Sequence, residues 1–233
     1  MKNIFLIGTT FLFIQIASAG QFTDLYTDLM PEIDRVSSPL KTQKSFKVHL
    51  LDSFQKFPAL SDLKNQNIDV FGTTKTFNGT MTYVYVFKKK YKYDVVFQNN
   101  RYIFNVRIHF NGATPKDYIE FYKKIKLAEK EWNNSRLLTD FNYEFKFSVE
   151  LDIKKAHYSV IILDSTRGPY DTAWGRDWDG AVVAHEIGHM MGLGDEYQTA
   201  TSVSDCLSHS KMCSTKGLLM KHHYYFILRR LLK

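Results

Sequence analysis

The chain has 233 residues, with 31 Lys plus Arg against 24 Asp plus Glu and a formal net charge of +7. Its 15% aromatic and 24% charged residues exclude an intrinsically disordered chain, and only 12 Gly and 5 Pro exclude collagen-like and low-complexity classes. The length suits one domain, or one domain with a modest extension. The positive charge is compatible with a nucleic-acid or anionic-membrane partner.

Residues 1–19 have the organisation of a secretory signal peptide. Lys2 precedes an apolar run from Ile4 to Ile16, and small residues lead up to Ala19. The run is short for a membrane span, which needs about 20 apolar residues. We therefore expect cleavage after Ala19 and a secreted, periplasmic or extracellular protein. An uncleaved anchor is the alternative.

The sequence contains two cysteines, Cys206 and Cys213, in a polar stretch. Outside the reducing cytosol, a disulfide between them is the favoured state. A zinc-binding pair is disfavoured, because metal-binding cysteines are usually about two to four residues apart. Two free thiols are the remaining alternative.

The first strand signals follow a mixed segment without a sustained period. Alternating aromatic, β-branched and polar residues predict strands over 80–87, 91–97 and 102–110. Residues 98–101, which read Gln-Asn-Asn-Arg, predict a hairpin turn between the last two strands.

A helix start follows at Thr114, which can cap the helix, with Pro115 in the first helical position. Apolar residues then recur at helical spacing, predicting a helix of roughly 18 residues. Further along, the pattern predicts strands over 141–153 and 157–163, a short edge strand over 170–174, and helices over 179–191 and 224–232. This order is typical of an α+β (α/β-like) domain over about residues 100–233, with a twisted mixed sheet.

The most informative stretch runs from Ala184 to Tyr197. His185 and His189 are four residues apart, so on a helix both imidazoles project from one face and can reach one metal ion. Glu186 lies beside the first histidine and can act on a metal-bound water without ligating the ion. Gly192 can end the helix and turn the chain back.

Asp195 is the candidate third ligand after this turn. Two histidines, one aspartate and a water make an open, catalytic zinc site, in which Zn²⁺ lowers the pKa of the water to about 7 and polarises a carbonyl. Glu186 would take the proton of the water and later deliver it to the leaving amine. A chance occurrence of His-Glu-x-x-His in an amphipathic helix is the alternative, which the glycine and the aspartate at their offsets disfavour.

The spacing HExxHxxGxxD resembles that of the metzincin zinc endopeptidases, in the variant with Asp in place of the third His. It is similar to the snapalysin-type proteases, and the continuation Asp195-Glu196-Tyr197 is similar to the DEY of IgA-peptidase-like bacterial metallopeptidases. The resemblance covers roughly the last 130 residues. It implies a metzincin-type catalytic domain over 100–233, with a long helix, an HExxH helix and a methionine turn for which Met220 is the candidate.

Some metzincins place an oxyanion-stabilising Tyr two residues after this methionine. In this chain the position is His222, and His223, Tyr224 and Tyr225 follow it. All four remain candidates for that role or for ordinary surface positions. Glu196 could compete with Asp195 as a ligand, although its offset is one residue wrong.

We therefore predict a secreted zinc-dependent endopeptidase. The alternatives are a degenerate zinc-binding protein without protease activity and a zinc amidohydrolase acting on a non-peptide substrate. The signal peptide would be followed by an N-terminal region over 20–99 with β-hairpins, serving as propeptide or accessory part. Because no cysteine precedes Cys206, this region cannot block zinc through a thiolate.

The charge is unevenly distributed along the chain. Residues 81–130 carry 11 basic and 4 acidic side chains and residues 206–233 carry 6 basic ones, whereas residues 131–205 carry 6 basic and 13 acidic. The metal motif therefore lies in an acidic segment of a basic protein. We expect a monomer that acts on protein or peptide substrates, prefers basic peptides near the zinc and makes weak contact with anionic cell surfaces. Nucleic acid is disfavoured as a partner.

Overall fold

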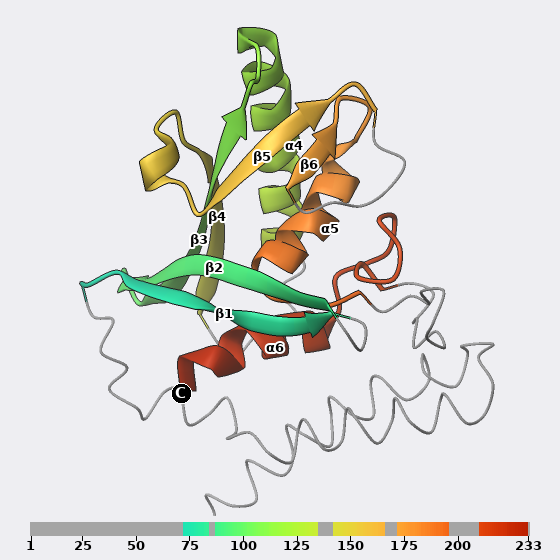
Figure 1. Ribbon diagram of the computed structural model, residues 1–233. Helices are drawn as coiled ribbons and strands as arrows, with labels where there is room; N and C mark the ends of the chain where they lie inside the picture. The colour runs from blue at the N-terminus through green and yellow to red at the C-terminus, as the bar shows by residue number, and fades with distance from the viewer. Residues whose placement is uncertain (1–71, 84–86, 135–141, 166–171, 196–209, 233) are drawn as a thin grey trace, which may run out of the picture.

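The computed structural model describes residues 72–83, 87–134, 142–165, 172–195 and 210–232. The expected signal peptide and most of the expected N-terminal region lie outside these residues. The described chain is α+β with a mixed sheet, as predicted (Figure 1). None of its helices is both long and apolar enough to span a membrane.

The sheet has six strands in the order β1-β2-β3-β5-β6, and β4 pairs with β3 outside this path. The strands are β1 Lys75–Tyr83, β2 Phe87–Gln98, β3 Arg101–Asn111, β4 Tyr143–Val149, β5 Tyr158–Leu163 and β6 Ala173–Gly175. The helices are α4 Pro115–Asn134, α5 Gly180–Met190 and α6 Lys221–Leu228, with 3₁₀ turns at Ile153–Lys155 (η2) and Arg229–Leu232 (η3). The predicted order of strands and α-helices is confirmed, but the strand predicted over 141–153 ends at Val149 and is followed by the 3₁₀ turn η2.

β2 and β3 form the predicted hairpin, with Gln98 opposite Arg101. The two turn residues, Asn99 and Asn100, have φ of 52° and 58°. Asparagine adopts this left-handed conformation more readily than most residues, and two such residues give a turn whose twist matches that of the strands. The first hairpin is displaced from its predicted position, because Phe87 begins β2 opposite Tyr83 and does not end β1.

β3 is the central strand, and its two edges are used differently. β4 pairs with it in parallel from Tyr102 to Ile108. β2 pairs antiparallel with residues 101–105, and β5 pairs in parallel with residues 108–111. β2 and β5 thus follow one another along β3. The first part of β2, residues 87–93, extends beyond β3 and pairs with β1 alone, and β2 also contacts α5 (Figure 1).

The sheet is continuous across residues 99 and 100, where the N-terminal region was expected to end. Tyr93 and Val95 of β2 are completely buried in the same hydrophobic core as β3 and the helices. Phe77 of β1 packs against this core and stacks on Tyr93 at a centroid distance of 5.7 Å. The β1–β2 pair is therefore part of the core that supports the C-terminal helices.

α4 begins as predicted. The Thr114 hydroxyl accepts from the Asp117 backbone N–H (3.2 Å), and the Asp117 carboxylate accepts from the Thr114 N–H (2.9 Å), so the two residues cap the helix reciprocally. Arg176 donates from Nε and Nη2 to the same carboxylate at 2.7 and 3.0 Å. These hydrogen bonds hold the pKa of Asp117 well below its usual range and join α4 to the end of β6.

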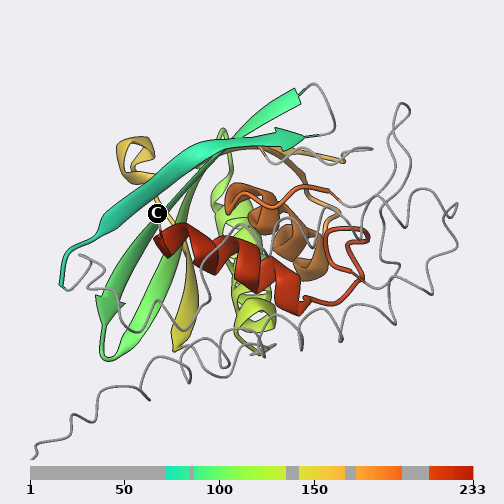
Figure 2. The same ribbon diagram turned by 90° about the horizontal axis from the view of Figure 1, so that it is seen from below.

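α6 begins at Lys221, three residues before the predicted start, and ends in the 3₁₀ turn of η3. His223 explains the early start, because its Nδ1 accepts from the Met220 backbone N–H at 3.0 Å and satisfies one of the free donors of the first turn. Histidine is not a usual capping residue, so the earlier start could not be predicted from residue types. α6 closes the lower end of the described structure (Figures 1 and 2), with Tyr224 packed edge-on against Trp132.

On the sheet, His157 is buried beside charged side chains. Its Nδ1 accepts from the Arg107 backbone N–H at 3.1 Å, and its Nε2 lies 3.3 Å from Oδ1 of Asp94. Burial, with the positive charges of Arg107 and Lys92, lowers the pKa of His157 to about 4 against the opposing effect of Asp94. His157 is therefore neutral in the folded protein at pH 5.

This histidine is expected to make stability pH-dependent. Between pH 6.5 and about 4 the unfolded chain binds a proton at His157 that the folded chain does not, so acid favours unfolding. Urea unfolding in chelator should show the free energy of wild type falling by about 2 kcal/mol more than that of His157→Gln from pH 7 to pH 5. Parallel stability curves for the two proteins would contradict this assignment.

Candidate metal centre

α5 carries the predicted metal-binding motif. Asp179 caps the helix, its Oδ1 accepting from the backbone N–H groups of Ala181 (2.9 Å) and Val182 (3.0 Å). The indole Nε1 of Trp132 donates to the Ala184 carbonyl at 3.1 Å and ties α5 to α4. From Val183 to Met190 every side chain is buried, so the motif lies in the interior.

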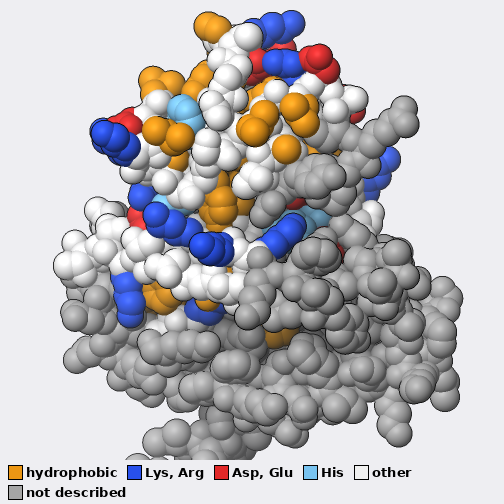
Figure 3. Space-filling view, in the orientation of Figure 1, with side chains coloured by type: hydrophobic (Ala, Val, Ile, Leu, Met, Phe, Trp, Pro, Cys, Tyr) orange, Lys and Arg blue, Asp and Glu red, His pale blue; other side chains and the backbone are white. Residues whose placement is uncertain are grey.

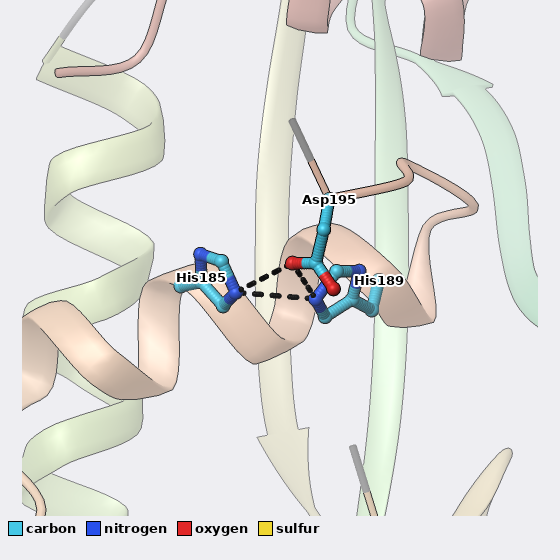
Figure 4. A group of neighbouring side chains, drawn as sticks. All are labelled: His185, His189 and Asp195. Carbon is cyan, nitrogen blue, oxygen red and sulfur yellow. Dashed lines mark hydrogen bonds and ion pairs between the residues drawn. The ribbon is translucent and has the colours of Figure 1, made fainter. Parts of the chain in front are cut away.

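The structure brings together the three predicted ligands (Figure 4). Nε2 of His185 and Nε2 of His189 lie 3.1 Å apart. Oδ1 of Asp195 lies 3.2 Å from the first of these nitrogens and 3.0 Å from the second. The side chains of all three residues are at most 2% exposed. One ion placed among these two nitrogens and this oxygen would therefore be coordinated by all three from one side.

Backbone carbonyls fix the tautomer of both histidines. Nδ1 of His185 lies 2.7 Å from the carbonyl oxygen of Lys211, and Nδ1 of His189 lies 2.8 Å from that of Leu193. Because a carbonyl only accepts, each Nδ1 carries the hydrogen and each neutral ring has its lone pair on Nε2. Burial, followed by His185 and the positive charge of Lys89, lowers the pKa of His189 well below 6.5 and keeps this ring neutral.

This donor set fits a zinc ion. Two imidazole lone pairs and a carboxylate oxygen converge on one point, and two-His-one-carboxylate sets are typical of zinc sites that keep a coordination position open. The Nδ1–carbonyl bonds are the outer hydrogen bonds that usually orient metal-binding histidines. Glu186, between the two histidines in sequence, is completely buried.

The turn after α5 brings Asp195 to the histidines. Gly192 has a φ of +85°, and its N–H donates to the His189 carbonyl at 2.8 Å. The Leu193 N–H donates to the Gly188 carbonyl at 3.0 Å. These two bonds and the left-handed glycine form a Schellman motif. The same turn places the Leu193 carbonyl against Nδ1 of His189, so it positions two of the ligands.

Residues 210–212 pack against α5 and help to hold His185, a contact that the sequence did not predict. The backbone carbonyl of Lys211 accepts from Nδ1 of His185. The side-chain Nζ of Lys211 lies 2.7 Å from the Glu131 carboxylate and 2.7 Å from the Thr215 carbonyl. Met212 is buried, and its Sδ lies so close to Gly188 that an added Cβ there would be only 2.7 Å away. The sequence could not predict either contact. Every residue has a backbone carbonyl that could accept from His185, and Met212 lies in a polar stretch without helical or strand periodicity.

Met212 thus packs against the motif helix. Met220, the candidate from the resemblance, is partly buried and precedes α6, and its role stays a prediction. Two of the four candidates for stabilising an oxyanion have structural contacts. Nε2 of His223 lies 3.0 Å from the buried Ser210 hydroxyl, and the Tyr224 hydroxyl donates to the Trp132 carbonyl at 2.8 Å. The side chains of His222 and Tyr225 lie outside the description.

Cys213 is disulfide-bonded. Cys206, its expected partner, lies outside the described residues, as does Glu196, the alternative ligand to Asp195. The pairing of the cysteines and the exclusion of Glu196 stay predictions. Cys213 directly follows Met212, so a disulfide at this position would restrain the residues that contact His185 and Gly188.

No protein-family model, curated protein or solved structure matches this chain. Its functional assignment therefore depends on the chemistry and geometry of the site.

Proposed function

We propose that this chain is a zinc-dependent endopeptidase in which His185, His189 and Asp195 hold the ion and Glu186 is the general base. The observation that carries the proposal is the convergence of two Nε2 atoms and Oδ1 of Asp195 within 3.0–3.2 Å. The proposal is also supported by the long helix α4 and by the position of His185 and His189 on α5, since the metzincin resemblance implies a long helix and an HExxH helix.

Zinc bound at such a site lowers the pKa of a water to about 7 and polarises a carbonyl. The residues of the protein would orient the ligands and transfer the proton. The Lys211 and Leu193 carbonyls keep both Nε2 atoms unprotonated and fix the planes of the rings. Glu186 would accept a proton from the attacking water and transfer it to the nitrogen of the leaving amine. A purely structural metal site has no use for this carboxylate.

The substrate class and location are part of the same proposal. The motif lies in a segment of the chain with a net negative charge, which would favour basic peptides near the cleavage site. Basic side chains gather over the β1–β2 pair (Figure 3), where Lys75, Lys90 and Lys92 are exposed. They would favour weak contact with an anionic cell surface after export through the signal peptide.

The test is a joint measurement of zinc content and protein cleavage. The purified protein should bind one equivalent of zinc and cleave denatured casein, and 1,10-phenanthroline should abolish cleavage until zinc is restored. His189→Ala should lose both properties. His109→Ala is the matched control, because Nδ1 of His109 also contacts a backbone carbonyl, that of Glu150 at 3.0 Å, outside the site.

The outcomes separate the competing functions. Zinc binding without cleavage of casein would favour a zinc-binding protein without protease activity, and chelator-sensitive cleavage of small amides alone would favour a non-peptide amidohydrolase. Absence of zinc, or cleavage that survives chelation, would overturn the proposal.

A further inference from the structure

The carbonyls from Gly188 to Gly192, at the end of α5 and in its turn, all accept hydrogen bonds, and three of them accept from two side chains of distant segments. The Gly188 and His189 carbonyls accept from the N–H groups of the Schellman turn. The Met190 carbonyl accepts from the Tyr158 hydroxyl at 2.6 Å. The next two carbonyls, of Met191 and Gly192, both accept from the guanidinium of Arg230.

Arg230 lies near the end of the chain, in the 3₁₀ turn Arg229–Leu232 that follows α6. Its Nη2 donates to the Gly192 carbonyl at 2.7 Å, and its Nη1 donates to the Met191 carbonyl. The guanidinium stacks on the ring of Tyr91 at 4.3 Å from the centroid. Leu231 beside it is 3% exposed and anchors this turn in the core.

The fit around Gly192 is tight. A Cβ on this residue would lie 2.7 Å from Nη2 of Arg230 and 2.8 Å from Cδ1 of Tyr91. Gly192 is therefore enclosed by a side chain from each end of the described chain. A cation at this position also interacts favourably with the negative end of the α5 dipole.

We propose that Arg230 is a positioning residue of the metal centre, holding the turn that orients His189 and delivers Asp195. The residue after Gly192 supplies the carbonyl that fixes His189, and Asp195 follows two residues later. Arg230 donates to two backbone carbonyls of this turn, so it acts through the backbone. The inference rests on the metal-binding half of the proposed function and does not require that the protein cleave peptides.

The test compares zinc affinity with stability in the full-length protein. Arg230→Met keeps an unbranched side chain but removes every donor, and it should weaken zinc binding by about 10- to 100-fold in a chelator competition, as loss of an outer hydrogen bond typically does. Arg230→Lys keeps one charged donor and should restore part of this loss. The visible spectrum of the Co²⁺-substituted protein should change in Arg230→Met, since the ligand geometry is altered.

Arg176→Met is the matched control. Arg176 also bridges distant segments through bonds to a buried partner, Asp117, but it lies at the far end of α4. Its removal should lower the urea midpoint of the zinc-free protein and change zinc affinity by less than about 3-fold.

An unchanged zinc affinity and Co²⁺ spectrum in Arg230→Met would overturn the inference, as would equal losses in both arginine variants. If Arg230→Met does not fold, Arg230→Lys is the deciding variant. A zinc affinity and a Co²⁺ spectrum equal to those of wild type in Arg230→Lys would then overturn the inference. Zinc binding by wild type without cleavage would instead reject the proposed peptidase and leave the role of Arg230 intact.

Discussion

Glu186→Gln is expected to reduce cleavage of casein by about 10²- to 10⁴-fold while the protein still binds one equivalent of zinc. Glutamine has nearly the shape of glutamate but cannot take a proton from water. Glu186 is completely buried within α5. A substitution of equal size should therefore leave the helix and the hydrogen bond from His185 to the Lys211 carbonyl in place. The ligands themselves are unchanged, so metal content should not fall.

The measurement is the initial rate of cleavage at equal zinc occupancy, with zinc determined on the same sample. Glu120→Gln is a suitable control, because Glu120 lies on the exposed side of α4 with 42% of its side chain accessible. Activity of Glu186→Gln close to that of wild type would reject Glu186 as the base. Loss of zinc together with activity would show that its carboxylate supports the metal site.

A chain shortened to residues 100–233 is expected not to fold. It lacks β1 and β2, and with them Tyr93 and Val95, which are completely buried, and Phe77 and Tyr91, which pack on the core. Burying one large apolar side chain contributes roughly 1.5–3 kcal/mol. Losing several of them approaches the 5–15 kcal/mol by which a typical domain is stable. The truncation also removes the ring on which Arg230 stacks.

Circular dichroism and urea unfolding of the fragment 100–233 should show no cooperative transition, whereas a fragment starting at Gly72 should unfold cooperatively. N-terminal sequencing of the secreted protein should accordingly place the mature terminus before Lys75. A propeptide that includes β2 is thereby disfavoured. An active secreted enzyme that begins near residue 100 would contradict this prediction.

Local signals in the sequence were sufficient for most elements and for the grouping of His185, His189 and Asp195. The reciprocal cap of Thr114 and Asp117, the Asn99-Asn100 turn and the spacing of His185, His189 and Asp195 each involve residues a few positions apart. Such patterns are legible because the interacting groups are side chains of restricted types at fixed offsets.

The supports of the site were not predictable in the same way. His185 is oriented by the backbone of Lys211, and a backbone carbonyl is present at every residue. Arg230 is 38 residues away from Gly192 in sequence, and Tyr91 approaches the turn from β2. These contacts depend on how β2 extends beyond β3 and on where α6 packs on the core, and no local sequence period encodes either arrangement.

The position of Arg230 has a consequence for the timing of activity during synthesis. A chain is made from its amino terminus, so β2 and the motif helix exist before the residue that holds their shared turn. A peptidase built in this way would acquire the arginine that holds this turn only after the segment following α6 has been made. Until that segment is made, the Met191 and Gly192 carbonyls would lack the guanidinium that donates to both of them.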